Sequence, residues 1–180
     1  MFRKIVRYFA NKRLVEFYKS GKRTTKIKTL KNSKIVGIVW NPADEGGIET
    51  YELLRKTLQS KGIKPIGMAH IGSGREMETL STITHSGFLD RKSVSCLGRP
   101  KTGAGMDFIQ EPFDILIDIS IAKTVAAQYT LVHSAAIFKV GWKGTEPNFY
   151  DLNIDVSEKP QCRYLMEQIV YYLENINEKS

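Results

Sequence analysis

Acidic side chains in two separate segments are the residues in this sequence best suited to catalysis. Asp44 and Glu45 lie in the polar segment 41–47, and Asp118 lies within a long apolar run. A carboxylate pair made of Asp44 or Glu45 with Asp118 could bind a divalent cation or act as a general acid and base. Two ordinary alternatives are that the loop acids are solvated and that Asp118 caps the helix that follows it. Asp44 and Asp118 are therefore candidate catalytic residues, although the sequence does not fix their separation.

The sequence matches neither of two common phosphate-binding motifs. The segment 98–105 is rich in glycine, but Ala104 and Gly105 occupy the places where a P-loop needs Lys and then Ser or Thr. The dinucleotide fingerprint G-x-G-x-x-G is absent after the first apolar run, where Asp44 and Glu45 would repel a bare phosphate. The sequence therefore predicts no cofactor.

The histidines and cysteines show none of the spacings that are typical of metal sites. His70, His85 and His133 are far apart, so we predict no metal site and expect each histidine to be a surface or helix-capping residue. Cys96 and Cys162 are too few and too distant for a disulfide framework. Cys162 falls on an apolar helical stripe, whereas Cys96 would need a nearby base, such as His85 or His133, to act as a nucleophile.

Apolar periodicity predicts alternating strands and helices after residue 34. The run at 113–121 carries apolar residues on both faces, which is typical of a buried parallel strand. The predicted strands are 34–40, 63–71, 94–97, 113–121 and 135–142. The predicted helices are 48–61, 122–133 and 158–177, with a helical turn at 76–82 and glycine-rich loops between the elements.

This alternation predicts an α/β domain over residues 35–180, with a mainly parallel sheet of four or five strands and helices on both faces. The winding would be flavodoxin-like or Rossmann-like. The length of 180 residues, with 42% hydrophobic and 26% charged, excludes a disordered chain, a collagen and a membrane-spanning bundle. Ligands of such sheets bind at the carboxyl ends of the strands. The residues predicted to bind a ligand there are Asn41, Glu45, Gly46, Gly47, Ser120 and Gly141.

Positive charge is concentrated in residues 1–34, a basic arm that precedes the predicted domain. The arm holds 12 Lys and Arg residues against one acid, a net charge of +11, whereas the remainder has 15 bases and 18 acids, a net charge of −3. Apolar spacing predicts a helix over residues 2–19 that Gly21 ends. The residues that share its apolar face are Phe2, Ile5, Val6, Phe9 and Ala10. Residues 20–34 are predicted to form a linker or an exposed ribbon.

The basic arm is open to three interpretations. Its apolar face packs on its own domain, its charges bind a polyanion such as RNA or a ribosomal surface, or it lies on an anionic membrane surface. The predicted polyanion-binding residues are Arg3, Lys4, Arg7, Lys12, Arg13, Lys22 and Arg23. A further basic cluster near residues 91–101 could extend such a surface or simply be solvated.

Three apolar segments resemble those of an uncharacterised bacterial family of small α/β proteins, a domain of unknown function. These segments are residues 113–118, 136–141 and 150–154, and the basic helix before the first strand also resembles that family. The resemblance covers most of the chain and implies no activity. It suggests that Asp118, Lys139, Gly141 and Asp151 should be tested together.

The function that the sequence favours is a non-enzymatic protein whose basic arm binds a polyanion. The first alternative is an enzyme that handles a small molecule or nucleotide at the strand ends through Asp44, Asp118 or Lys139, and the second is a peripheral membrane protein. The beginning of the chain lacks the continuous apolar stretch of a signal peptide, and no window is long enough to cross a membrane. We therefore expect a cytoplasmic protein, and the sequence leaves its oligomeric state open.

Overall fold

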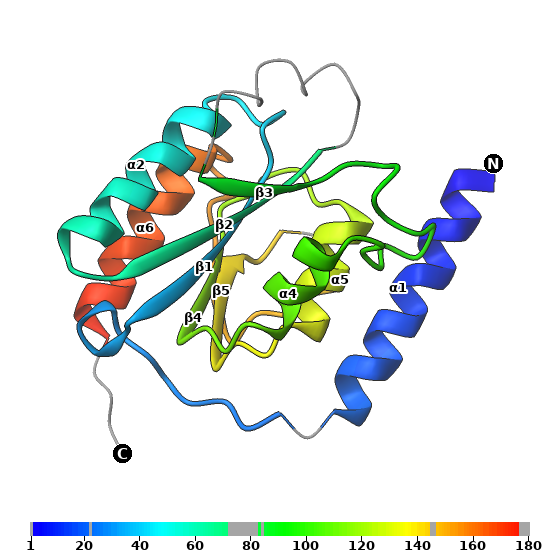
Figure 1. The fold of residues 1–180 in the computed structure, drawn as a ribbon, viewed down its shortest axis with the longest axis horizontal. Helices are drawn as coiled ribbons and strands as arrows, with labels where there is room; N and C mark the ends of the chain where they lie inside the picture. The colour runs from blue at the N-terminus through cyan, green and yellow to red at the C-terminus, as the bar shows by residue number, and fades with distance from the viewer. Residues whose placement is uncertain (1, 22, 72–82, 84, 145–146, 177–180) are drawn as a thin grey trace.

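Six parallel strands form one sheet at the centre of the molecule (Figure 1). The structure is a computed structural model that describes residues 2–21, 23–71, 83, 85–144 and 147–176, with side chains from residue 7 onward. The strands are β1 (Ile35–Trp40), β2 (Lys64–His70), β3 (Ser86–Leu89), β4 (Ile115–Asp118), β5 (Phe138–Trp142) and β6 (Leu152–Ile154). Their order, β3-β2-β1-β4-β5-β6, is that of Rossmann-type doubly wound sheets. The predicted α/β class is confirmed, and the sheet has six strands rather than four or five.

Helices cover both faces of the sheet (Figure 1). The pair α2 (Gly47–Ser60) and α6 (Cys162–Asn175) packs on one face, and the pair α4 (Gly103–Gln110) and α5 (Val125–His133) packs on the other. Alternation along β4 explains both cores, because Ile115 and Ile117 enter the α2–α6 side while Leu116 enters the α4–α5 side. The helix α1 (Phe2–Ser20) lies outside α5, and a 3₁₀ turn, η1 (Leu30–Asn32), precedes β1.

The edges of the sheet differ most from the sequence prediction. The predicted strand at 94–97 is wrong: Val94 forms only an isolated bridge with Pro100, and the edge strand is β3, which was predicted as a loop because it contains Gly87. That glycine leaves room for a neighbour, since a Cβ on it would lie 2.8 Å from Met68 Cε. The glycine-rich stretch ends in α4, whose first turn is capped by Thr102. The predicted helical turn at 76–82 lies outside the described residues.

The helix α1 packs on its own domain, which is the first of the three interpretations of the basic arm. Ala10 and Leu14 are buried, and Leu14 contacts Val132 and Phe149 in a small separate core. The predicted apolar face is only partly correct. Ala10 belongs to it, but Phe9 is 55% exposed, and the side chains of Phe2, Ile5 and Val6 lie outside the described part. Among the described residues, no helix has the length and apolar character that crossing a membrane requires.

Candidate functional site

The predicted carboxylate Asp44 lies at the carboxyl edge of the sheet, where it holds the loop that follows β4. One of its oxygens accepts a hydrogen bond from the backbone N–H of Ile121 at 2.7 Å, and the other accepts one from Ala122 at 3.1 Å. The amide of Asn41 donates to the carbonyl of Ala122 at 3.4 Å, so both side chains tie the β1–α2 loop to the β4–α5 loop. Burial raises the pKa of Asp44 although these hydrogen bonds oppose the shift. Asp44 therefore holds the β4–α5 loop in place.

The second predicted carboxylate, Asp118, belongs to a buried, hydrogen-bonded cluster with Lys123 and Tyr150. Asp118 accepts hydrogen bonds from the Tyr150 hydroxyl at 2.5 Å, from Lys123 Nζ at 3.0 Å and from the Ser120 backbone N–H at 2.8 Å. Lys123 also donates to the Tyr150 hydroxyl at 2.7 Å. Burial alone would raise the pKa of Asp118, but Lys123 and these donors outweigh it and the pKa is lowered. The cavity that Lys123 and Tyr150 line measures only about 10 Å³, which is far smaller than a small-molecule site.

Of the six residues predicted to bind a ligand, the three glycines allow a turn or a close approach, and the other three are polar residues of loops at the carboxyl edge. A Cβ on Gly141 would lie 2.5 Å from the Tyr150 ring, and one on Gly47 would lie 2.5 Å from the Asn41 carbonyl oxygen. Gly46 has a φ of 67° at the start of α2, and the carbonyl of Glu45 accepts a hydrogen bond from Cys162 Sγ. Ser120 is buried, and its hydroxyl has no partner in the described part of the chain. None of the six lines the cavity of about 620 Å³ that is described below.

The third predicted catalytic residue, Lys139, lies away from the two carboxylates. In the β4–β5 register Gly141 pairs with Asp118, whereas Lys139 pairs with Leu116 nearer the amino end. Lys139 is fully buried, and its Nζ donates to the carbonyl of Leu131 near the end of α5. Burial, with the Arg23 charge, lowers the pKa of Lys139 to about 7. Lys139 therefore lies two residues along β5 from the position that pairs with Asp118, and a catalytic role for any of the three candidates stays a prediction.

A large cavity opens at the carboxyl ends of β2 and β3, beside the start of α5. Its volume is about 620 Å³. Its polar lining comes from α1, from the end of β2, from the loop after β3 and from the cap of α5, namely Arg7, His70, Arg91, Ser95, Cys96 and Thr124. This position agrees with the rule that ligands of doubly wound sheets bind outside the carboxyl ends of the strands.

His70 forms the buried wall of this cavity, and it is the least satisfied polar side chain there. It is 1% exposed, and neither ring nitrogen has a hydrogen-bond partner in the described part of the chain. Burial lowers the pKa of His70 to about 4, although the Asp118 charge opposes the shift. The neutral ring offers one N–H donor and one acceptor. The expectation that His70 is a surface or capping residue is wrong, and an unpaired buried donor of this kind points to a function.

The amino end of α5 gives the same cavity a positive electrostatic character. Thr124 caps the helix by accepting from the Ala127 N–H at 3.0 Å, and helix geometry leaves the N–H groups of Val125 and Ala126 without intrahelical acceptors. Both residues line the cavity. Gly98 brings the opposite wall against this turn: its φ is 86°, and a Cβ on it would lie 2.6 Å from the Val125 carbonyl oxygen. Aligned peptide dipoles and free N–H groups at a helix start favour a bound anion.

Three of the residues that line the cavity carry formal charge: Arg7, Arg91 and Asp90. The carboxylate of Asp90 is already hydrogen-bonded within its own turn. Arg7 and Arg91 supply two cations. The carboxylate of Asp90 accepts from the Ser93 N–H at 2.7 Å and from the Lys92 N–H at 3.1 Å, which closes its own turn. Among the described residues, no group of three or more His, Cys, Asp or Glu side chains could hold a metal ion. The cavity is therefore suited to an oxyanion.

One family model matches residues 4–176, and it describes a family of unknown function, DUF6913. The chain belongs to this family. The resemblance that the segments 113–118, 136–141 and 150–154 indicated is confirmed to that extent. None of the curated proteins matches the chain. The range matched by DUF6913 begins inside α1 and ends after α6, so it includes the basic helix as well as the sheet.

The sequence analysis missed most of the cavity lining because the lining residues come from four distant segments. Arg7 was predicted to bind a polyanion, which stays a prediction, and the structure places it on the cavity wall. His70 was identified at a strand end but assigned to the surface. A signal was present, since His70 and Ile71 end a covered strand that points toward the edge where ligands bind.

Proposed function

We propose that this protein binds a small organic molecule with an oxyanion group, a phosphate or a carboxylate, in the cavity at the carboxyl ends of β2 and β3. The observation that supports it most is His70, whose two ring nitrogens lie unpaired in the wall of that cavity. Leaving such a group unsatisfied costs about 1–3 kcal/mol, which a ligand would offset on binding. A volume of about 620 Å³ lies in the range of small-molecule sites.

Each part of the cavity would have its own task in holding the ligand. The N–H groups of Val125 and Ala126 would donate to the oxyanion, and Arg7 and Arg91 would neutralise its charge. His70 would donate to one ligand oxygen from its neutral ring and accept from a hydroxyl or amide through its other nitrogen. This division places the anion at α5 and the polar body of the ligand against β2. In this proposal the cavity residues bind and orient the ligand, and no chemical step is assigned to them.

Three oxyanions of different size test the proposal: inorganic phosphate, adenosine 5′-monophosphate and citrate. We expect binding of at least one, measured by calorimetry, together with a shift of the His70 ring resonances in NMR spectra. Arg91→Ala should weaken that binding about tenfold, which corresponds to one lost charge-assisted contact. Lys92→Ala is the matched control, because Lys92 is the next residue, is exposed and does not line the cavity.

Two outcomes would contradict the proposal. One is that none of the three oxyanions moves the His70 resonances at millimolar concentration. The other is that Arg91→Ala and Lys92→Ala weaken binding equally, which would mean that the anion is attracted by surface charge and not held in the cavity.

A further inference from the structure

The helix α1 and the segment that follows it carry six exposed basic side chains, which we call the basic path. They are Lys12, Arg13, Lys19, Lys26, Lys31 and Lys34, and all of them are exposed. Among the described residues, no carboxylate forms an ion pair with any of the six. Unpaired cations in such number attract polyanions by releasing their counterions.

Two other cations in the same segment fasten it to the domain. Arg23 donates to the Ala136 carbonyl at 2.9 Å and pairs with Asp151, and Lys28 pairs with Asp114 at 3.1 Å. The prediction that Arg23 binds a polyanion is not supported by this geometry, because its guanidinium is engaged. These contacts hold the segment that carries part of the basic path against the domain. A fastened segment presents its lysines in fixed places, so a ligand need not immobilise it on binding.

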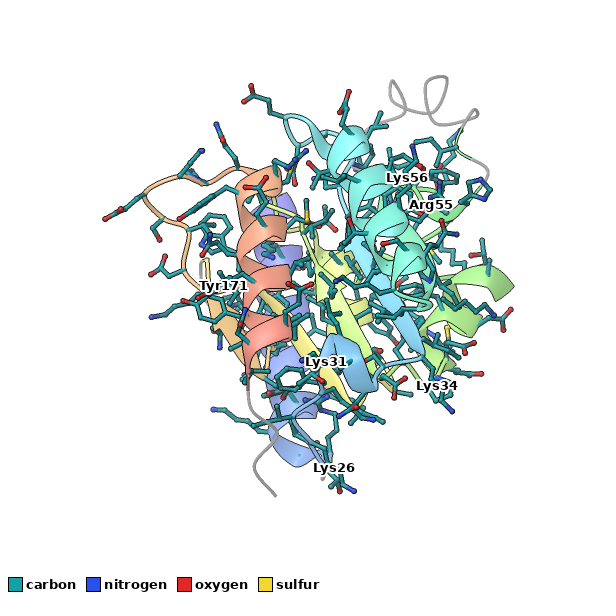
Figure 2. All side chains as sticks on the ribbon, turned by 90° about the vertical axis from the view of Figure 1, so that its left-hand side faces the viewer. Lys26, Lys31, Lys34, Arg55, Lys56 and Tyr171 are labelled. Carbon is teal, nitrogen blue, oxygen red and sulfur yellow. The ribbon has the colours of Figure 1, made fainter. Side chains whose placement is uncertain are left out.

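The basic path runs along one side and then around one end of the molecule. Figure 1 shows α1 beside α5, with the following segment passing below the sheet to reach β1. Figure 2 shows Lys26 at the lower end of the molecule and Lys31 and Lys34 above it in the lower half, whereas Lys56 lies higher up on α2. The three labelled lysines of the segment therefore lie in the same part of the molecule.

The outward side of α1 has the chemistry of a nucleic-acid surface more than that of a membrane helix. Helical spacing places Tyr8, Lys12 and Lys19 on one side, roughly opposite the buried Ala10 and Leu14. A helix lying in a bilayer needs an apolar outward face, and here lysines occupy its centre. Tyr8 is 65% exposed, and its ring lies edge to face with that of Phe9, with 5.7 Å between the ring centroids. Exposed aromatic rings beside cations form stacking platforms for unpaired bases.

We propose that the basic path binds single-stranded RNA, with phosphates along its lysines and an unpaired base stacked on Tyr8 or Phe9. Unpaired bases are the parts of RNA that aromatic side chains recognise. This function is separate from the proposed ligand cavity, because Arg7 and Arg91 line the cavity and belong to no part of the basic path. Of the other residues predicted to bind a polyanion, the side chains of Arg3 and Lys4 and all of Lys22 lie outside the described part.

Fluorescence anisotropy with a labelled oligouridylate of about 20 nucleotides, longer than a typical single-strand site, tests the proposal. The full chain should bind it with an affinity that falls steeply with salt. The triple variant Lys12→Gln, Lys19→Gln, Lys26→Gln should weaken binding more than tenfold and reduce the salt slope by about 2, since each phosphate contact on a single strand contributes about 0.7. The charge-matched control is Lys56→Gln, Lys64→Gln, Lys92→Gln, which should leave the affinity within about twofold and the slope unchanged.

A second variant separates stacking from charge. Tyr8→Ser with Phe9→Ser should weaken binding of the oligouridylate at least fivefold and leave binding of duplex RNA unchanged, because stacking requires an unpaired base. Three results would overturn the proposal: equal loss in the two lysine triple variants, equal loss of duplex and single-strand binding in the aromatic variant, or stronger binding to phosphatidylserine vesicles than to the RNA. The response of His70 to phosphate is the independent control, and none of these variants should alter it.

Discussion

The carboxyl edge of the sheet holds two buried polar regions that differ in how their hydrogen bonds are met. Around Asp118, the carboxylate pairs with Lys123 and Tyr150 bonds to both, and the cavity that Lys123 and Tyr150 line measures about 10 Å³. Around His70, both ring nitrogens are unpaired within the described residues, and the space measures about 620 Å³. Residue type alone would assign chemistry to the first region, because it contains a carboxylate, a lysine and a tyrosine.

If the proposed function is correct, an unpaired buried side chain in a large cavity marks a binding site more clearly than a concentration of charge does. A satisfied buried cluster holds the fold together, since each group in it stabilises the others. An unsatisfied buried group costs stability, and a bound ligand, ion or water is one way in which its hydrogen bonds are completed. The Asp118 cluster should therefore control stability, and the His70 cavity should control binding.

The largest expected effect comes from breaking the satisfied cluster. Asp118→Ala leaves Lys123 buried without its counter-charge, and such a change costs about 3–5 kcal/mol of the free energy of unfolding. Urea unfolding followed by circular dichroism measures this loss. The double variant Asp118→Leu, Lys123→Met removes both charges and should recover most of the stability. A loss below about 1 kcal/mol for Asp118→Ala would mean that water reaches the cluster and that the two regions do not differ as described.

Lys139 provides an intermediate case, a buried cation whose Nζ donates to one carbonyl. Its pKa of about 7 in the folded chain lies below the ordinary value of 10.5. Between these values the unfolded chain holds a proton that the native Lys139 has released, so the free energy of unfolding rises with pH, by about 1.4 kcal/mol per pH unit. Urea unfolding at several pH values between 7 and 9 measures this slope.

Lys139→Met should remove that rise, because methionine has no proton to lose. Lys143→Met is the control, since Lys143 follows the same strand and is exposed. The same slope in the wild type and in Lys139→Met would show that the lysine is charged in the folded protein, and that one carbonyl satisfies it as fully as the Asp118 cluster satisfies Lys123.

The fold could be predicted wherever local pattern and burial agree. β1 was predicted at 34–40 and lies at Ile35–Trp40, because a β-branched run there ends in Asn41-Pro42. The edge strands β3 and β6 were missed because they have four and three residues, too few to show a period. Their positions depend on pairing with β2 and β5, which is tertiary information.

The candidate site was harder to predict because its character depends on partners distant in the sequence. Asp44 was chosen for its charge, yet its partners are backbone N–H groups 77 and 78 residues away. His70 lines a cavity only because the loop after β3 and α5 form the other walls. The carboxyl edge as a location could be predicted from topology, whereas the distinction between a paired and an unpaired side chain could not.

The smallest expected effect is also the one with the opposite sign, and it tests the unsatisfied region directly. His70→Leu replaces two unpaired nitrogens by apolar atoms of similar size, so the free energy of unfolding at pH 7 should increase by about 1 kcal/mol. The same variant should lose binding of the oxyanion that the wild type binds, because the neutral ring donor is gone. His85→Leu is the matched control, since His85 is exposed, and it should change neither property. A loss of stability in His70→Leu would mean that the ring nitrogens are already satisfied in the free protein, and the contrast between the two buried regions would disappear.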